Sequence, residues 1–153
     1  DPVFDKLDAR LGQAILSIGA VKGLEIGDGF AAAASTGSRN NDGFTMDESG
    51  RITKLTNHAG GILGGISDGS DIVVRAAFKP TPSIASKQRT VNCSGAPIEL
   101  EIRGRHDPVI VPRAVVVVEA MTALTVADAL LAGMSARLEN VKKVWGSADS
   151  RKP

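Results

Sequence analysis

Three polar segments of the chain carry residue types that could do chemistry. The first is a KPTPS stretch in which a cation stands beside two hydroxyl groups on a backbone stiffened by two prolines. Its residues are Lys79, Pro80, Thr81, Pro82 and Ser83. This combination suits a phosphate or another anion, but it is also typical of the solvated end of an edge strand. The residue types alone favour the edge-strand interpretation.

The second segment, residues 57–69, is unusually rich in glycine. Its sequence is NHAGGILGGISDG, with five glycines in thirteen residues, a composition that disfavours a helix. It contains neither of the two glycine fingerprints of nucleotide-binding loops. We expect a loop whose backbone amides lie bare to a ligand or to another stretch of backbone. A mobile surface loop is the alternative.

The third segment holds an arginine and a carboxylate two positions apart, Arg105 and Asp107, on a predicted turn. Such a pair can hold a substrate and move a proton. The two side chains can also simply pair with each other, as many exposed residues do. His106 lies between them and points the other way in an extended segment, so we assign it no role. Spacing alone does not decide between these interpretations.

Other kinds of catalytic centre find little support in the sequence. His58 and His106 lie far apart and lack the spacing of zinc ligands, so we expect no metal site. Cys93 has no basic neighbour in the sequence and is expected to be a spectator. No G-x-S-x-G motif is present to form an acyl-enzyme.

The elements that must position these segments follow from periodicity and turn signals. Apolar residues at three- and four-residue steps predict a helix over residues 2–17, with Asp1 as its N-cap and Pro2 at its first position. A long apolar helix is predicted from Pro112 to about Ala132. Between the two helices we expect a hairpin over residues 45–57 and strands at residues 21–26, 71–78, 89–93 and 97–103, followed at the end by a short helix over residues 135–145. The pattern predicts an α+β fold of antiparallel strands packed on long helices.

Composition limits the functional classes. The chain has 153 residues, a net charge of +1 and 3% aromatic residues, so we expect no nucleic-acid or membrane-surface binding. The long apolar segment is interrupted by Glu119 and Asp128, which favours a buried core helix over a membrane span. One cysteine suits a reducing compartment, and we expect a cytoplasmic globular protein without a signal peptide.

Four separate stretches resemble the chorismate synthase family, and they occur in the family's order. They are DPVFDKLDARLGQAILSIGAVKGLEIGDGF, NHAGGILGGISDG, KPTPSI and GRHDPVIVPRAVVVVEAMTALTVADALL, at residues 1–30, 57–69, 79–84 and 104–131. The chain departs from the family pattern at two positions. Val109 stands where the family usually has cysteine, and Gly19 stands where it commonly has proline or asparagine.

The resemblance implies a β-α-β sandwich, with a helical layer between antiparallel sheets, in a homotetramer. It also implies the 1,4-anti elimination of phosphate from 5-enolpyruvylshikimate 3-phosphate, which gives chorismate and depends on reduced FMN. The flavin contacts of the family fall on Gly19, Ala20, Gly64, Lys79, Pro80, Thr81, Pro82, Ser83 and Arg105. Asp107 matches the carboxylate proposed to relay a proton by way of flavin N5.

The family's amino-terminal half supplies a G-E-S-H-G-type histidine and an arginine-rich loop, and neither motif occurs in this chain. We therefore expect the carboxy-terminal part of such an enzyme, with residues 1–133 belonging to its domain and residues 134–153 forming a terminal helix and a polar tail. The isolated chain is then expected to have little or no activity. The alternative is a non-catalytic module that binds flavin or another anion, or that serves in assembly.

Overall fold

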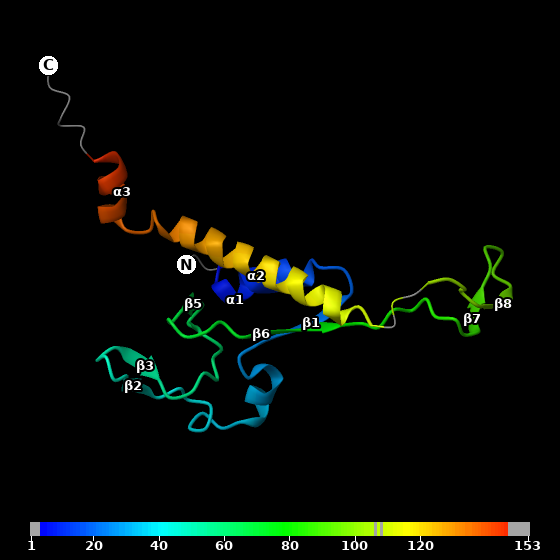
Figure 1. The fold of residues 1–153 in the computed structure, drawn as a ribbon, viewed down its shortest axis with the longest axis horizontal. Helices are drawn as coiled ribbons and strands as arrows, with labels where there is room; N and C mark the ends of the chain where they lie inside the picture. Colours follow the sequence, from blue (N-terminus) through cyan, green and yellow to red (C-terminus); the bar gives the residue numbers. More distant parts are fainter. Residues whose placement is uncertain (1–3, 106, 108, 147–153) are drawn as a thin grey trace, which may run out of the picture.

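Two packed helices and one antiparallel strand pair form the body of the molecule. The computed structural model describes residues 4–105, 107 and 109–146. Helix α1 (Leu7–Leu16) packs against β1 (Val21–Ile26) and against α2 (Val111–Gly133). Strand β1 pairs with β6 (Val74–Phe78), and the two helices lie along this pair in Figure 1.

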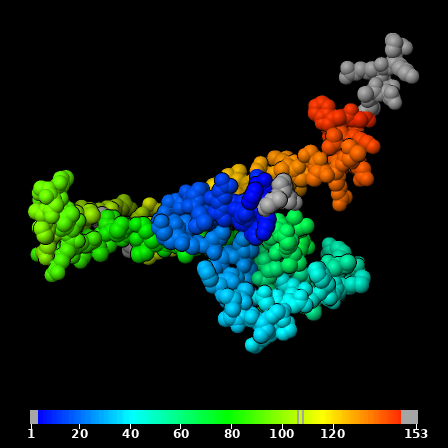
Figure 2. Space-filling model, turned by 180° about the vertical axis from the view of Figure 1, so that it is seen from behind, coloured from blue at the N-terminus to red at the C-terminus, as the bar shows by residue number. Residues whose placement is uncertain are grey.

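The remaining strands form three antiparallel hairpins. These are β2 (Phe44–Met46) with β3 (Ile52–Lys54), β4 (Ile62–Leu63) with β5 (Ile66–Ser67), and β7 (Gln88–Val91) with β8 (Pro97–Leu100). A 3-10 helix, η1 (Gly29–Ala34), follows β1, and α3 (Leu138–Trp145) follows α2. Figures 1 and 2 show the β7–β8 hairpin and α3 projecting from opposite ends of the body. Every strand pair in the described residues is antiparallel, as the predicted α+β class requires.

The first helix begins later than predicted. Asp1 and Pro2 lie outside the described residues, and the helix begins at Leu7 rather than at Pro2. The backbone N–H of Leu7 donates to the carbonyl oxygen of Gly65 at 2.8 Å. A contact with a distant segment therefore satisfies one of the free amides of the first turn, which no local capping pattern can reveal.

The segment 57–69 is not a loop throughout, as was predicted, because residues 62–67 fold into the β4–β5 hairpin. The predicted close approach to another stretch of backbone is present, since a Cβ at Gly60 would lie 2.3 Å from the Gly27 nitrogen. Gly64 and Gly65 form the turn of the hairpin with φ of 59° and 86°, the paired positive values that suit tight two-residue hairpins. Several amides are also satisfied: Gly61 N–H donates to the Asn57 side-chain oxygen at 2.8 Å, and Asp68 N–H donates to the Gly61 carbonyl at 3.0 Å. The glycines are needed for the turn and for close backbone packing.

The prediction that the long helix is buried was also wrong for this chain. Helix α1 contributes Leu7, Leu11 and Ile15 to a small core, whereas α2 contributes only Ala114. One face of α2 contacts α1, and much of the rest of its apolar surface is exposed. By length and composition alone α2 could cross a membrane, a criterion that core helices of soluble proteins also meet.

Candidate functional site

The end of the β1–β6 pair brings the first of the predicted flavin-binding residues together. Val21 is paired with Phe78, and just beyond this pair the backbone N–H of Lys79 donates to the carbonyl of Ala20 at 2.9 Å. Gly19 and Lys79 thus lie on neighbouring segments although they are far apart in sequence. Antiparallel pairing accounts for this proximity, because the start of one strand meets the end of the other.

Ala20 has an unusual backbone conformation. Its φ is 70°, and it is the one non-glycine residue with positive φ among the described residues. A residue with a Cβ loses roughly 1–2 kcal/mol in this region of φ and ψ. Such strain persists where the surrounding structure enforces it, and it is frequent at binding sites.

Residues 79–83 leave the sheet as an extended segment with exposed polar groups. Lys79 and the two prolines are exposed, and Thr81 and Ser83 are half-buried. The Gln88 side chain donates to the Pro82 carbonyl at 3.0 Å, which ties this segment to β7. Within the described part of the chain Lys79 forms no ion pair, so its ammonium group is available to an anion.

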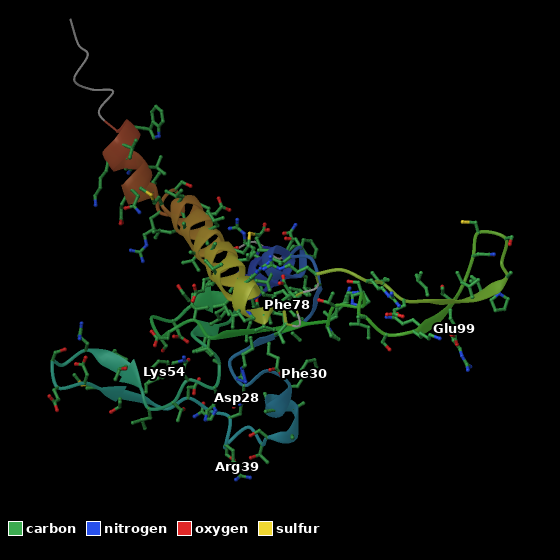
Figure 3. The ribbon with its side chains drawn as sticks, turned by 45° about the vertical axis from the view of Figure 1, so that its right-hand side comes forward. Asp28, Phe30, Arg39, Lys54, Phe78 and Glu99 are labelled. Carbon is green, nitrogen blue, oxygen red and sulfur yellow. The ribbon has the colours of Figure 1, made fainter. Side chains whose placement is uncertain are left out.

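Arg105 and Asp107 lie on the segment that returns from β8 to α2. Figures 1 and 3 show this segment running beside the one that leads from β6 to β7. Asp107 does not need Arg105 as its partner, because its Oδ2 lies 2.7 Å from Nη1 of Arg113 in the first turn of α2. Sequence reasoning did not single out Arg113. His106 lies outside the described residues.

Gly64 lies apart from the other predicted flavin contacts. It occupies the tip of the β4–β5 hairpin beside the amino-terminal end of α1, where Gly65 accepts from Leu7. Ala20 follows the carboxy-terminal end of the same helix. Because α1 has ten residues, its two ends are about 15 Å apart. The structure therefore gathers Gly19, Ala20 and the lysine segment at one end of α1 and places Gly64 at the other.

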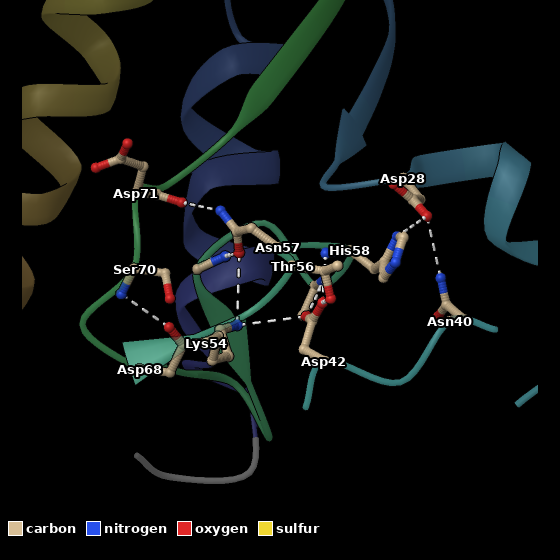
Figure 4. A network of polar contacts seen from close by, with 12 residues as sticks. Asp28, Asn40, Asp42, Lys54, Thr56, Asn57, His58, Asp68, Ser70 and Asp71 are labelled. Carbon is tan, nitrogen blue, oxygen red and sulfur yellow. Dashed lines mark hydrogen bonds and ion pairs between the residues drawn. The ribbon is translucent and has the colours of Figure 1, made fainter. Parts of the chain in front are cut away.

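A buried ionic cluster that the sequence did not reveal supports the glycine hairpin. Lys54 Nζ lies 3.3 Å from Oδ2 of Asp42 and 2.7 Å from Oδ2 of Asp68, and each of these side chains is at least 92% buried. Asp42 also accepts hydrogen bonds from the Thr56 hydroxyl at 2.6 Å and from the backbone N–H groups of His58 and Ala59 (Figure 4). These residues are dispersed over residues 42–68, so no local spacing signals the cluster.

The cluster keeps its members charged. Burial would raise the pKa of Asp42, but hydrogen bonds from the Thr56 hydroxyl, two backbone amides and Lys54 outweigh it and hold that pKa well below its usual range. The pKa of Asp68 is lowered in the same way, because hydrogen bonds from Lys54 and Ser70 overcome its burial. Burial would lower the pKa of Lys54, but its hydrogen bonds to the two carboxylates raise it.

A second polar contact joins the glycine segment to the turn after β1. Asp28 Oδ2 lies 2.7 Å from Nδ1 of His58 and 3.2 Å from Nδ2 of Asn40. The backbone N–H of Asp28 also donates to the His58 carbonyl at 2.8 Å. His58 therefore links two loops. Among the described residues no three histidine, cysteine or acidic side chains are placed to hold a metal ion, and Cys93 is exposed.

The strands and helices define an α+β protein with exposed polar residues at one end of the β1–β6 pair, and comparison with known proteins identifies its family. The sequence profile of chorismate synthase matches residues 1–131. A chorismate synthase of Lachnoclostridium phytofermentans is 67% identical over 145 residues, which are 95% of this chain and 40% of that protein. One of Archaeoglobus fulgidus is 61% identical over 132 residues, covering 86% of this chain and 36% of that protein.

Comparison with solved structures points to the same family. A crystal structure of chorismate synthase matches 90% of this chain and 33% of its own length, with a TM-score of 0.63 and 38% identity. The chain belongs to the chorismate synthase family, the lyases of the shikimate pathway. The likeness confirms the α+β fold as part of the chorismate synthase fold. The chain spans about two fifths of the length of the curated relatives it matches.

Proposed function

We propose that this chain supplies one part of the active centre of a chorismate synthase. The reaction is the 1,4-anti elimination of phosphate from 5-enolpyruvylshikimate 3-phosphate to give chorismate, with reduced FMN bound, in a soluble cytoplasmic homotetramer. The observation that supports this proposal best is the junction at the end of the β1–β6 pair. There the backbone of Lys79 bonds to Ala20, whose backbone is strained, and both match flavin contacts of the family.

The residues present fit a flavin mononucleotide. The ammonium group of Lys79 and the hydroxyl groups of Thr81 and Ser83 form a donor set suited to anionic groups. At Gly64 a Cβ would meet no atom within 4 Å, so the backbone stands open to a flat ring. Because Gly64 lies at the far end of α1, a single flavin must be extended to contact both groups of residues. Arg105 supplies a second cation, besides Lys79, for an anionic group of the cofactor or the substrate.

Asp107 is the proton acceptor of the proposed mechanism. Its carboxylate forms an ion pair with Arg113 in the amino-terminal turn of α2, which favours a position close to that helix. When bound, the electron-rich reduced flavin assists the departure of phosphate. The chain's own part is to hold the anionic groups through Lys79 and Arg105 and to accept the proton that leaves the substrate carbon at an oxygen of Asp107.

We propose that the isolated chain has little or no activity. The sequence lacks the G-E-S-H-G-type histidine and the arginine-rich loop that the amino-terminal half of the family supplies. The second candidate function is a module that binds flavin or assembles without catalysis. The open apolar surface of α2 favours an assembly role, because a soluble protein seldom leaves such a surface uncovered.

A chimeric protein tests the proposal. In it this chain replaces the segment of the Lachnoclostridium phytofermentans chorismate synthase to which it is 67% identical. We expect the chimera to bind FMN and to release phosphate from 5-enolpyruvylshikimate 3-phosphate when the flavin is reduced. The isolated chain should bind FMN more weakly and release phosphate much more slowly or not at all. A folded chimera that neither binds FMN nor turns over substrate would contradict the proposal. Turnover by the isolated chain would contradict the expectation that it is inactive.

A further inference from the structure

We propose that Lys54, held between Asp42 and Asp68, is a positioning residue that fixes the orientation of the β4–β5 hairpin and so places Gly64 against the flavin. This inference rests on the proposed function, because it takes Gly64 as a flavin contact. It concerns three residues that the family resemblance does not assign to the site.

Asp42 holds the beginning of the glycine segment. Its two oxygens accept the backbone N–H groups of His58 and Ala59 at 2.8 and 2.9 Å and the Thr56 hydroxyl at 2.6 Å. These donors are consecutive or nearly so along the backbone, so one carboxylate fixes the direction in which the chain enters the segment. The fourth donor is the ammonium group of Lys54 at 3.3 Å.

Asp68 holds the end of the same segment. Its backbone N–H donates to the Gly61 carbonyl at 3.0 Å, which closes the base of the β4–β5 hairpin. Its side chain accepts from Lys54 at 2.7 Å through one oxygen and from the backbone N–H of Ser70 at 2.9 Å through the other. Lys54 on β3 therefore links both ends of the glycine segment to the β2–β3 hairpin (Figure 4).

The tip of the hairpin is held on one side and open on the other. The carbonyl of Gly65 accepts from Leu7, and a Cβ at Gly65 would come within 2.9 Å of three carbons of the Lys6 side chain. Gly64, one residue earlier, faces open space. The hairpin thus has a packed side and an exposed tip, and the orientation of that tip depends on how its base is fixed.

A buried ion pair is a poor source of stability, because desolvation offsets much of the attraction between the charges. It is more effective at selecting one arrangement, since a single ammonium group can meet both carboxylates only when the two ends of the segment are correctly placed. Asn57 adds to this selection, because its side chain joins Gly61 N–H to the Asp71 carbonyl at 2.8 Å each. We therefore assign Lys54 a geometric role.

The test uses the chimera with Lys54→Met and, as a milder change, Asp68→Asn. Asp68→Asn keeps an acceptor for Ser70 and leaves the contact of Lys54 with Asp42 in place. Arg51→Met is the matched control, because it also removes a cation from the β2–β3 hairpin, but Arg51 is 82% exposed and pairs only with Asp47 and Ser49 in the described structure. FMN affinity is measured by fluorescence titration, the flavin environment by visible circular dichroism, and folding by far-ultraviolet circular dichroism and melting temperature.

We expect both cluster variants to be folded at the assay temperature, to bind FMN about tenfold more weakly or worse, and to show an altered flavin dichroism, as expected when a binding group is misplaced. The Arg51→Met chimera should bind FMN as the parent does. Lower melting temperatures with unchanged affinity and spectrum would overturn the inference, as would failure of both variants to fold, because the cluster would then be purely structural. A parent chimera that binds no FMN would instead refute the proposed function itself.

Discussion

Arg113 Nη1 lies 2.7 Å from one carboxylate oxygen of Asp107, so the two side chains form an exposed ion pair next to the first turn of α2. A proton acceptor needs a defined position relative to the carbon that loses the proton. At the residue scale, the proposed chemistry therefore depends on two side chains, Asp107 and Arg113, which lie close together in the sequence.

Replacing Asp107 by Asn in the chimera should lower turnover by roughly a hundredfold or more, because the amide cannot accept the proton. FMN affinity should change little, since Asp107 is not among the residues that match flavin contacts of the family. Steady-state rates and a flavin titration on the same preparation give both quantities. Glu48→Gln, a change at an exposed position of the β2–β3 hairpin, is the control, and turnover of Asp107→Asn equal to that of the control would rule out the catalytic role.

Ala20 gives a second prediction at this scale. Ala20→Gly should raise the free energy of unfolding of the isolated chain, by at most about 1 kcal/mol, because glycine adopts positive φ without strain. Ala20→Val should lower it by roughly 1–2 kcal/mol, since a β-branched residue is least compatible with that conformation. Urea unfolding measures both changes. Equal stability of the two variants would show that the backbone at Ala20 is not strained in solution.

The residue types drew attention to Lys79, Arg105 and Asp107, but only the resemblance to the family assigned them to a flavin site. Arg113 was missed because an arginine in the first turn of an apolar helix has no local pattern that identifies its partner. The assignment of the flavin contacts to individual residues remains a prediction.

At the element scale, the Lys54 cluster sets the pH range of stability. The pKa values of Asp42 and Asp68 are lowered in the folded state and that of Lys54 is raised. Groups with lowered pKa stabilise the fold above their unfolded value of about 4 and lose this effect as pH falls towards the folded value. A group with raised pKa stabilises below its unfolded value of about 10.4 and loses this effect as pH rises through the folded value.

The isolated chain should therefore have nearly constant stability between about pH 5 and pH 9 and become less stable on both sides of that range. Urea unfolding at a series of pH values measures this dependence. In Lys54→Met the loss of stability at alkaline pH should be smaller than in the parent, because the group that titrates there is gone. An identical alkaline dependence in the two proteins would show that Lys54 does not contribute to it.

A second prediction at the element scale concerns stability, and it follows from the close contact between the turn after β1 and the glycine segment. A Cβ at Gly27 would lie 2.0 Å from the His58 carbonyl oxygen, and one at Gly60 would lie 2.3 Å from the Gly27 nitrogen. Gly27→Ala and Gly60→Ala should each destabilise the chain by roughly 2–4 kcal/mol, since backbone must move to admit the methyl group. Gly37→Ala, where a Cβ meets nothing within 4 Å, is the control. Stability like that of the control would contradict this close packing.

Local patterns predicted the positions of most elements but not what joins them. Alternating residues marked β1 and β8, and turn residues marked the β2–β3 and β7–β8 hairpins. The β4–β5 hairpin was missed because its strands have two residues each and glycine composition dominates the segment. The start of α1 was misplaced, because the helix begins at Leu7, where the backbone N–H bonds to Gly65 far along the chain.

At the scale of the whole molecule, the uncovered face of α2 should govern the behaviour of the isolated chain. Val116 and Leu124 are 62% and 64% exposed on a helix that offers little charge. We expect the isolated chain to self-associate, because large exposed apolar surfaces associate in water. Light scattering coupled to gel filtration, over a range of concentrations, measures the average mass.

Replacing Val116 and Leu124 together by Lys should shift the isolated chain towards the monomer. The same double change should impair folding or assembly of the chimera, where this face is expected to be covered. Val144→Lys, at an exposed position of α3, is the control for added charge. A mass distribution unchanged by the double substitution would show that α2 does not mediate the association. Burial of α2 could not be read from the sequence, because periodicity shows that a helix is apolar but not which element covers it.

The pairing of β1 with β6 also sets the order of events during folding. Helix α1 and the three hairpins consist of contacts between near neighbours in sequence, so each can form early and independently. The β1–β6 pair joins residues as distant as Val21 and Phe78, so the intervening chain must be brought together before this pair gains any contact. Closing this loop, and the longer one that joins Arg10 of α1 to Asp128 of α2, is expected to be slow. The end of the β1–β6 pair, where Ala20 meets Lys79, therefore forms only after its loop has closed.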